Sequence, residues 1–546
     1  MIDPAGRHAW LWLLPAFGLC YFWNLGASEF TPIDESRSVV IVRDMTESGN
    51  WLLPRTPDGY LSEKPPLYYG LSGVASSLLG RNEWTIRGVS VLMALATLLV
   101  VGWTAQLFGT CRTSVIAVGV LGSNILFTAW ARTAMVDMTF TFFVSVGMAA
   151  YFAARKGRLG LWAAAALCGL SFGLAVLCKG PLGLALPVAG VVGDLLISSR
   201  GRFWKAPFPW AAVGASLLIT IEVSLLWYLP AALAGGREFL QTSVLDENFY
   251  MPLGLSRGIA GSHAKPLWYY PTRQLMVFLP TAAFLPETFR WLFQKRADPD
   301  RTLLATWTAA GLLILMVASN KRAYYLLPLQ PAIALMIAAA VSPLWDADPA
   351  KWLRWGARLA GGLVVIFALT GAAINVARID IPGFEEGHRL ADLLEDRHGW
   401  VAVACGIAGA SGILMLLASR GRSSAMIQAA ILSGLLIAGL RSFVLDPIRG
   451  SEDRMRPFVS DMIRHVPPGA RVAIWPPIYG YALDGYWPTR LKRDVVAAAA
   501  ADLFFVRENS IPELPFAVET LGTLGYSTEI RRVALVRRTK NPGASR

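Results

Sequence analysis

The sequence predicts an all-α polytopic membrane domain followed by a small extramembrane α/β domain. Of the 546 residues 54% are hydrophobic, and mean hydropathy is +0.46. This balance is typical of multi-span helical membrane proteins and not of soluble domains of this size. Long apolar runs recur up to residue 445, whereas residues 446–546 hold only short ones. We therefore predict a membrane domain at 1–445 and an α/β domain at 446–546.

About thirteen apolar runs are long enough to cross a bilayer as helices. They lie at roughly 9–26, 88–108, 113–131, 134–154, 160–178, 180–198, 208–233, 268–289, 302–319, 324–342, 357–378, 400–418 and 424–445. The shorter piece at 66–80 is predicted to be a juxtamembrane helix at the bilayer surface. The first run is long for the apolar core of a signal peptide, so we expect it to stay as the first span.

The distribution of charge predicts the orientation. The net charge of +13 comes from Lys and Arg residues that cluster in short loops between spans, which is a topology signal and does not favour nucleic-acid binding. The alternate loops, at 27–87, 234–267 and 379–399, are longer and richer in acids. The positive-inside rule then places the N-terminus in the cytoplasm and, with an odd number of spans, the C-terminal domain in the periplasm.

The C-terminal region and the cysteines show no catalytic motif. Short β-type runs at 471–475, 503–507 and 533–537 alternate with helical or turn-rich stretches at 455–465 and 491–502. This domain has no Gly-rich phosphate loop, metal-ligand spacing or nucleophile elbow, so we expect a structural or acceptor-related role. The five cysteines lie in or beside apolar runs without C-x-x-C spacing and are predicted to be packing residues.

A charged segment, Thr31–Tyr69, lies between the first two apolar stretches and is predicted to contain the active site. An ordinary polar loop would also explain it. However, Asp34 and Glu35 follow the first span closely, and Glu63-Lys64 comes directly before the next apolar stretch. Such charges next to a bilayer are costly unless they face water, each other or a ligand.

Further polar side chains are predicted to gather on the same outer face: Asp137, Lys179, Arg257, His263, Lys321, Arg322, Tyr324 and Tyr325. Most have a simpler explanation when taken alone, as an interfacial anchor (Lys179), aromatic-belt residues (the tyrosines) or loop residues (Arg257 and His263). An acid within a span, as Asp137 is, usually has a functional partner. Several cations and acids at one interface together indicate a binding site.

A polyprenyl-phosphate-linked sugar has the chemistry that such a site would bind, because its phosphate lies at headgroup level and its tail in lipid. Transfer of the sugar needs cations that stabilise the departing phosphate and a carboxylate that activates or orients the acceptor. The cations suited to the phosphate are Arg37, Lys64, Lys179, Lys321 and Arg322. Asp34 suits the second task.

Several of these motifs carry a family resemblance: Asp34-Glu-Ser-Arg37, Glu63-Lys-Pro-Pro-Leu67, Arg132 with Asp137, Lys179-Gly-Pro181 and Lys321-Arg-Ala-Tyr-Tyr-Leu-Leu-Pro328. They resemble the bacterial branch of the dolichyl-phosphate-mannose–protein mannosyltransferase superfamily, and within it the undecaprenyl-phosphate aminoarabinose transferases that modify lipid A. The resemblance implies a GT-C glycosyltransferase fold with two juxtamembrane helices in the first periplasmic loop. It also implies a lipid-linked donor, inversion at the anomeric carbon, and a role in resistance to polymyxin and other cationic antimicrobial peptides.

The resemblance also implies roles for single residues. Asp34 matches the catalytic aspartate, and Lys64, Arg37 and Asp137 match residues around the donor phosphate. The expected substrate-binding residues are Glu35, Glu63, Lys179, Arg257, His263, Lys321, Arg322, Tyr324 and Tyr325. A zinc ion at Glu63 and His263 is a further prediction, although their spacing does not demand one. The chain departs from the family at Glu247-Asn248, where the family tends towards His-Asn.

Three functions stay open at this point. The first is transfer of aminoarabinose from undecaprenyl phosphate to a lipid A phosphate in the bacterial inner membrane. The second keeps the donor but uses a protein hydroxyl or another envelope glycan as acceptor. The third is a transporter or lipid flippase, which would carry charged sites near the bilayer midplane with repeat symmetry. The charges here gather at one face without a visible repeat, which favours the enzyme.

Overall fold

The computed structural model describes residues 4–30, 33–198, 209–251, 265–278, 281–294, 298–349, 351–377, 398–446, 455–475, 481–489, 491–492, 497–498, 500–514, 517–524 and 533–538. The chain forms two compact units. The helical unit comprises Met1–Leu25, Glu63–Tyr68 and Arg87–Ile448. The loop–sheet unit comprises Gly26–Ser62, Tyr69–Ile86 and Arg449–Arg546.

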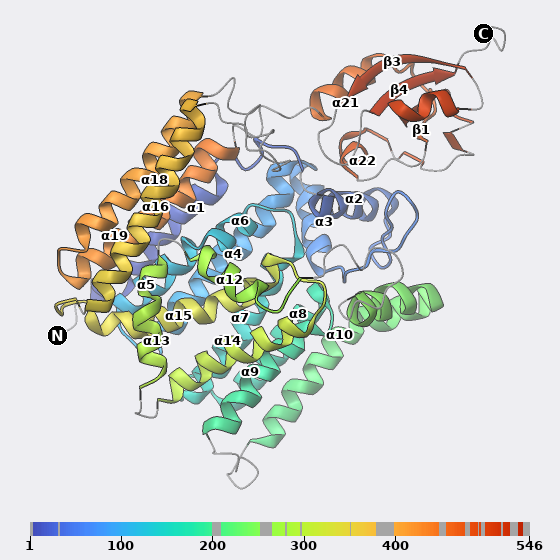
Figure 1. Ribbon diagram of the computed structural model, residues 1–546. Coiled ribbons are helices and arrows are strands. Elements are labelled where there is room, and N and C mark those ends of the chain that lie inside the picture. The colour runs from blue at the N-terminus through green and yellow to red at the C-terminus, as the bar shows by residue number, and fades with distance from the viewer. Residues whose placement is uncertain are drawn as a thin grey trace. The chain divides into compact units, whose positions relative to one another are not determined.

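The helical unit contains most of the α-helices (Figure 1). They are α1 (Leu13–Phe22), nearly all of α4 (Glu83–Gln106), α5 (Cys111–Gly122), α6 (Ile125–Ala131), α7 (Val136–Arg155), α8 (Leu161–Lys179), α9 (Leu182–Ser198), α10 (Trp210–Phe239), α12 (Tyr269–Val277), α13 (Leu285–Leu292), α14 (Pro299–Val317), α15 (Gln330–Val341), α16 (Lys351–Ala377), α18 (His398–Ala418) and α19 (Ser423–Leu440). The 3-10 helices η3 (Thr281–Phe284) and η4 (Ala323–Leu329) and the π-helix η2 (Leu240–Tyr250) join some of them.

The predicted polytopic α-helical domain is confirmed. Among the described residues, eight helices are long and apolar enough to cross a membrane, or nine if α5 and α6, bent by 68°, form one span. Three shorter apolar helices add to them. The predicted run at 268–289 differs, because it is divided among α12, η3 and α13. Pro286 lies in the first turn of α13, where proline is tolerated, whereas in the middle of one continuous helix it would remove a hydrogen bond and clash with the preceding turn.

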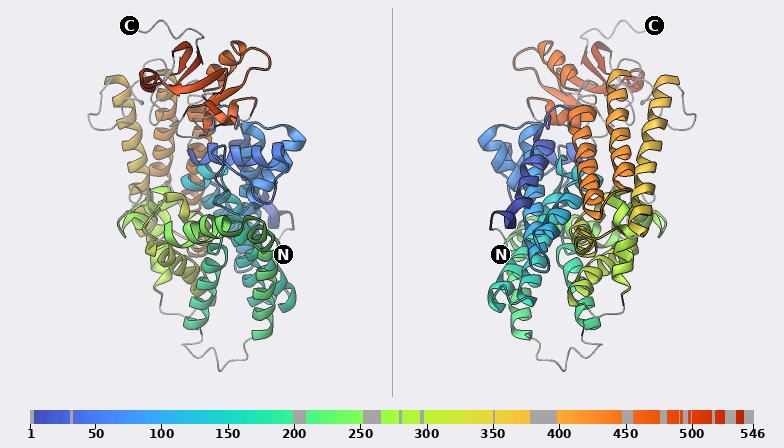
Figure 2. Two further views of the ribbon diagram at one scale, coloured as in Figure 1. Left: turned by 90° about the vertical axis from the view of Figure 1, so that its right-hand side faces the viewer. Right: turned by 90° about the vertical axis from the view of Figure 1, so that its left-hand side faces the viewer.

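Small residues and one buried ion pair hold the helical unit together. The helices α16, α18 and α19 lie side by side in both views of Figure 2. A Cβ atom at Gly361 of α16 would lie 2.8 Å from the carbonyl oxygen of Gly412 in α18, so only glycine allows this approach. Near α6, the Arg132 guanidinium pairs with Asp446 at 2.7 Å and donates to the carbonyl oxygen of Tyr21 at 2.7 Å. It thus ties the end of α1 to the segment that follows α19.

The loop–sheet unit joins the first predicted outer loop to the C-terminal region. The helices α2 (Ile33–Ser48) and α3 (Leu67–Leu79) are the two predicted juxtamembrane helices, and both are confirmed. Beyond the last span come α21 (Met455–Arg464) and α22 (Ala482–Tyr486). The Tyr486 hydroxyl accepts a hydrogen bond from the Phe30 backbone N–H at 2.8 Å and donates to Glu83 at 2.6 Å. A side chain of α22 therefore bonds to both ends of the first loop.

A four-stranded sheet in the order β1-β2-β4-β3 completes this unit. Its strands are β1 (Val472–Ile474), β2 (Leu503–Arg507), β3 (Val518–Leu524) and β4 (Val533–Arg538). β1 and β2 pair in parallel, and the other pairs are antiparallel. Phe504 and Phe505 on β2 are fully buried on opposite faces of the sheet, in two separate apolar clusters.

The three predicted strands are found, and the stretch at 455–465, predicted to be helical or turn-rich, contains α21, but β3 was not predicted. It contains Glu519, Thr520, Gly522 and Thr523, and its pairing with β4 shifts register between Thr520 and Gly522. Such a strand lacks apolar alternation and depends on pairing with its neighbour. The stretch at 491–502, predicted to be helical or turn-rich, falls partly outside the described residues. The domain boundary after residue 445 stays a prediction.

Candidate active site

Two ion pairs in the helical unit bring together residues that lie far apart in the sequence. Lys64, just before α3, donates to Glu247 of η2 at 2.5 Å. Lys179, the last residue of α8, pairs with Asp137 in the first turn of α7. The Asp137 and Lys179 side chains are 2% and 9% exposed, and those of Glu247 and Lys64 are 15% and 26% exposed. We call these four residues the four-charge cluster.

The local sequence explains how Lys179 and Asp137 meet. An acid in the first turn of α7 and a cation at the end of α8 both complement the helix dipoles. Gly180 then ends α8 with a φ of 67°, a conformation that favours glycine. A Cβ atom at this position would overlap with Oδ1 of Asn248 in η2. The Lys179-Gly-Pro181 motif thus lets η2 approach the end of α8.

Aromatic rings surround Lys179. Its Nζ lies 4.3 Å from the ring centroid of Tyr325 and 5.4 Å from that of Tyr324, both in η4. Tyr324 stacks in turn on Trp130, with centroids 5.2 Å apart. Cation–π attraction of this kind strengthens away from water. The predicted residues Lys179, Tyr324 and Tyr325 are therefore neighbours.

Lys64 remains a cation in this setting. Burial lowers the pKa of its ammonium, but the negative charge of Glu247 and the hydrogen bond to it act in the opposite direction and hold the pKa well above its ordinary value. Lys64 and Glu247 also interact electrostatically with Lys179, so the two ion pairs belong to one neighbourhood. Of these four groups, the two cations suit a ligand that carries phosphate oxygens.

The other predicted cations have different surroundings. Lys321 is 5% exposed and its Nζ donates to the carbonyl oxygens of Lys265 at 3.1 Å and Ala318 at 2.5 Å. It therefore fixes the backbone before η4. Arg322 interacts electrostatically with Tyr325. Arg257 and His263 lie outside the described residues.

The remaining predicted residues, Asp34, Glu35 and Arg37, belong to the loop–sheet unit. Asp34 and Glu35 occupy the first turn of α2, where the helix dipole stabilises carboxylates. Glu35 is only 1% exposed, whereas Asp34 and Arg37 are partly exposed. The Arg37 guanidinium lies 5.9 Å from the ring centroid of Tyr481. All three thus extend from one short helical turn.

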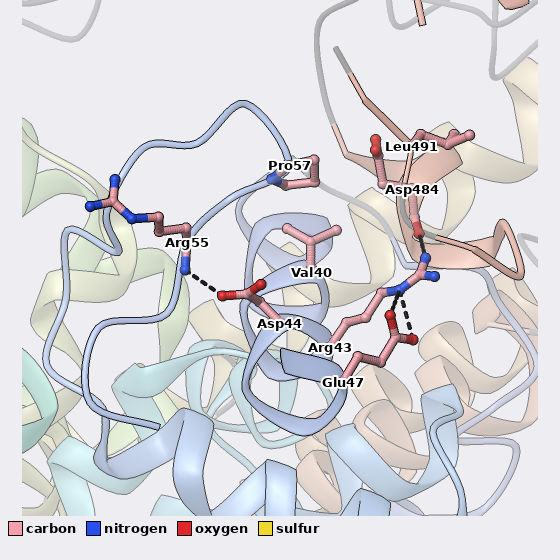
Figure 3. Close-up of a pocket in the computed structure, with 8 residues that line it drawn as sticks. All are labelled: Val40, Arg43, Asp44, Glu47, Arg55, Pro57, Asp484 and Leu491. Carbon is pink, nitrogen blue, oxygen red and sulfur yellow. Dashed lines mark hydrogen bonds and ion pairs between the residues drawn. The ribbon is translucent and has the colours of Figure 1, made fainter. Parts of the chain in front are cut away.

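A small pocket in the loop–sheet unit is built from charged groups that satisfy each other (Figure 3). The Arg43 side chain donates to Glu47 at 2.9 Å and to the carbonyl oxygens of Asp484 at 2.6 Å and Pro488 at 3.0 Å. Asp44 accepts a hydrogen bond from the Arg55 backbone N–H at 2.7 Å. These bonds join α2 to the C-terminal region, so we assign the pocket a structural role.

No described set of three or more His, Cys, Asp and Glu side chains is arranged to hold a metal ion. Glu63 is described and partly buried, but its predicted partner His263 is not described. The predicted zinc pair therefore falls partly outside the described residues.

Sequence reasoning missed the role of Glu247 as the partner of Lys64. The residue lies 183 positions away in the chain, within a helix of unremarkable local pattern. The one available signal was the replacement of the expected His-Asn by Glu247-Asn248. Tyr228, whose hydroxyl lies near Glu247 and Gly180, was not singled out either.

Comparisons with known proteins show which sequences the chain resembles. A family model described as dolichyl-phosphate-mannose-protein mannosyltransferase matches residues 63–227. The chain is 28% identical over 412 residues to an undecaprenyl phosphate-alpha-4-amino-4-deoxy-L-arabinose arabinosyl transferase of Pectobacterium carotovorum, a match that covers 72% of this chain and 70% of the relative. A transferase of the same name from Aeromonas salmonicida is 27% identical, with 71% and 70% covered.

Solved structures give the fold. The crystal structure of ArnT from Cupriavidus metallidurans bound to undecaprenyl phosphate matches with a TM-score of 0.77 at 18% identity, covering 98% of this chain and all of that one. An archaeal oligosaccharyltransferase from Archaeoglobus fulgidus matches with a TM-score of 0.54 at 13% identity, covering 92% of this chain and 70% of that one. The predicted GT-C fold and the predicted resemblance are thereby confirmed. The chain is a multi-pass membrane protein with the GT-C fold, and its sequence is similar to those of aminoarabinose transferases.

Proposed function

We propose that the protein moves 4-amino-4-deoxy-L-arabinose from undecaprenyl phosphate to a phosphate of lipid A. The observation that carries the proposal is the four-charge cluster, in a chain similar over 72% of its length to a transferase named for this donor. Two cations are available there for a phosphate, and carboxylates are available for the sugar. Lipid A modification of this kind accounts for resistance to cationic antimicrobial peptides, because it adds positive charge to an anionic surface.

The proposed reaction is a single displacement with inversion. A lipid A phosphate oxygen forms a bond to the anomeric carbon, and the bond from that carbon to the undecaprenyl phosphate oxygen breaks with its electron pair on the phosphate. The leaving phosphate gains negative charge, which Lys64 and Lys179 stabilise. The acceptor is already ionised near neutral pH, so Asp34 is not needed as a base and instead stabilises cationic character at the sugar. Arg37 and Asp137 are assigned, from the family resemblance, to the residues around the donor phosphate.

The reaction as written needs no metal ion and no nucleic acid. Binding of zinc at Glu63 and His263 stays a prediction, and transfer by purified protein with and without a chelator tests it. Zinc-dependent transfer would establish the ion, whereas chelator-resistant transfer by metal-free protein would remove it from the reaction.

We further propose that the protein lies in the bacterial inner membrane with its N-terminus in the cytoplasm. Residues 446–546, the proposed extramembrane domain, would then lie in the periplasm beside the acceptor. The support is the distribution of Lys and Arg in alternate short loops. A fusion of alkaline phosphatase after residue 546 is expected to be active, because this enzyme folds only outside the cytoplasm. An inactive fusion in cells that express the protein fully would reverse the orientation.

Mass spectrometry of lipid A tests the function. The host makes the donor but lacks its own lipid A sugar transferase, and it is complemented with the parent, Asp34→Ala or Lys64→Ala. We expect a pentosamine-sized addition with the parent alone. Lys156→Ala is the matched control, because Lys156 also forms a partly exposed ion pair, with Asp300 at 2.6 Å.

Two results would contradict the proposal. Unmodified lipid A with folded, membrane-inserted parent protein would point to another sugar or acceptor, such as a protein hydroxyl, or to a transporter. Modification that survives both Asp34→Ala and Lys64→Ala would leave the reaction in place and overturn the assignment of these residues.

A further inference from the structure

The four-charge cluster carries no net charge before any ligand binds. Lys64 and Lys179 contribute two positive charges, and Asp137 and Glu247 contribute two negative ones. A phosphate that entered alone would leave this buried neighbourhood negative, which is unfavourable at low dielectric. A ligand with one negative and one positive group would keep the cluster neutral. A phosphodiester-linked amino sugar is such a ligand.

Both carboxylates of the cluster have an unused oxygen. Asp137 uses Oδ1 for Lys179 and Glu247 uses Oε1 for Lys64. Within the described residues, Oδ2 of Asp137, Oε2 of Glu247 and the Tyr228 hydroxyl are buried without a hydrogen-bond partner. A buried acceptor without a hydrogen bond costs about 1–3 kcal/mol. Native proteins therefore rarely bury such an acceptor unless a ligand or a water molecule bonds to it. An ammonium or a hydroxyl group would supply the missing donors.

Glu247 is better placed than Asp137 to receive that donor. Asp137 is 2% exposed and stands in the first turn of α7, where the helix dipole and Lys179 hold it. Glu247 is 15% exposed and lies on a π-helix, whose wider turn is frequent at functional sites. Asn248 donates to the carbonyl oxygens of Ser243 and Val244 at 2.9 and 3.0 Å, which braces this turn beside Gly180.

We infer that Glu247 is the specificity residue for the amino group of the donor sugar. Before the donor binds, Glu247 neutralises Lys64. When Lys64 contacts the donor phosphate, the Glu247 carboxylate pairs with the sugar ammonium instead, and the Tyr228 hydroxyl is available to a neighbouring sugar hydroxyl. This inference rests on the proposed function, because it assigns recognition of the same donor to a residue outside the predicted set.

A comparison of two donors tests the role of Glu247. Purified full-length protein is given undecaprenyl-phosphate-linked 4-amino-4-deoxy-L-arabinose or undecaprenyl-phosphate-linked L-arabinose, which carries a hydroxyl in place of the amine. The ratio of kcat/KM for the two donors is measured for the parent and for Glu247→Gln. We expect the preference for the amino sugar to fall about tenfold or more in the variant, because a charge-assisted hydrogen bond is lost.

The control variants separate recognition from folding. Glu287→Gln removes another buried glutamate, which pairs with Arg290 outside the cluster, and is expected to leave the donor ratio unchanged. Glu247→Asp keeps the charge, and it is expected to retain the preference at a reduced rate. This variant also keeps the test decisive if Glu247→Gln does not fold.

Each outcome has one interpretation. A lower rate for both donors with an unchanged ratio in Glu247→Gln would overturn the inference, because Glu247 would then act only by orienting Lys64. The inference would also be overturned if Glu247→Asp bound both donors but no longer preferred the amino sugar. Parent protein that is folded but transfers neither sugar would instead overturn the proposed function.

Discussion

The Arg43 site of the loop–sheet unit and the four-charge cluster of the helical unit differ in how completely their buried charges are hydrogen-bonded. In the loop–sheet unit, each of the three guanidinium nitrogens of Arg43 donates a hydrogen bond, to Glu47 or to carbonyl oxygens of the C-terminal region. In the four-charge cluster of the helical unit, Asp137 and Glu247 each keep a buried oxygen that has no partner among the described residues. Both sites contain ion pairs by distance, but only at the Arg43 site do the charged nitrogen atoms and the oxygen atoms of the paired carboxylate all have hydrogen-bond partners.

This difference distinguishes a structural charge from one that a ligand completes. A fully bonded buried cation rigidifies the segments that it joins, whereas an incomplete polar network costs free energy in the unbound protein. Arg43 and Lys64 both come from the charged segment Thr31–Tyr69, and the hydrogen-bond partners of each became visible only in the structure. Substitutions in both units test whether complete hydrogen bonding of a buried charge marks it as structural.

The largest effect is expected from the Asp137–Lys179 pair. Asp137→Leu leaves Lys179 buried without its partner, which should cost about 3–5 kcal/mol of stability. Transfer should fall more than about 100-fold, because the cation is no longer oriented. The double variant Asp137→Leu with Lys179→Met should recover most of the stability but none of the transfer. Tryptophan-fluorescence unfolding in detergent and the lipid A assay measure the two quantities.

The double variant decides what kind of pair this is. If it transferred sugar at the parental rate, the pair would be structural in the same sense as Arg43, and the contrast between the units would fail.

Arg43→Met should destabilise the loop–sheet unit by about 3 kcal/mol, because it removes one of the two cations that pair with Glu47 and takes the Arg43 donors away from three carbonyl oxygens. Limited proteolysis followed by identification of the cleavage sites measures this. Arg81→Met is the control: Arg81 also pairs with Glu47, at 2.8 Å, but both side chains are partly exposed, so a cost below about 1 kcal/mol is expected. A fully stable Arg43→Met protein that has lost transfer would show a direct role in the reaction.

Gly180→Ala should reduce transfer about tenfold. Gly180 has a φ of 67° and a ψ of −156°, a conformation nearly restricted to glycine that costs another residue about 1–3 kcal/mol, and a Cβ atom here would also overlap with Asn248. Gly157→Ala is a matched control, because Gly157 has a φ of 64° but no atom within 4 Å of an added Cβ. Both variants place an alanine at a positive φ, and only Gly180→Ala should also displace η2. Equal transfer by the two variants would show that the approach of η2 to α8 does not matter for the reaction.

The smallest effect concerns the pH dependence of stability. Burial raises the pKa of Glu47, but hydrogen bonds from Arg43 and Arg81 lower it more, so its folded pKa lies below its ordinary value. Its contribution to stability is therefore present above the unfolded pKa and is lost as pH falls through the folded pKa. Because Glu47 is 41% exposed, we expect Glu47→Gln to flatten the acid side of the unfolding profile by no more than about 1 kcal/mol. Identical profiles between pH 7 and 3 for parent and variant would show that this pairing adds nothing.

Much of the fold could be predicted from the sequence, because a segment that crosses a bilayer has its structure set by its own residues. A segment that crosses hydrocarbon must bond its own backbone and must be apolar along its whole length, so α7, α8 and α14 are visible as hydropathy runs. The strand β3 has no such local signature, since it is specified by pairing with β4. The broken stretch from α12 to α13 was missed because composition alone does not register its prolines.

The sequence by itself determined most of the long apolar helices, and it made Asp34, Lys64, Asp137 and Lys179 candidates for the reaction. Only the tertiary structure decided that Asp137 pairs with Lys179, that Glu247 pairs with Lys64, and that Arg43 and Lys321 are bonded to backbone carbonyls. The reason is physical. Side-chain type sets what a residue is able to bind, but a charge is neutralised by whichever partner the packing of distant helices brings within reach.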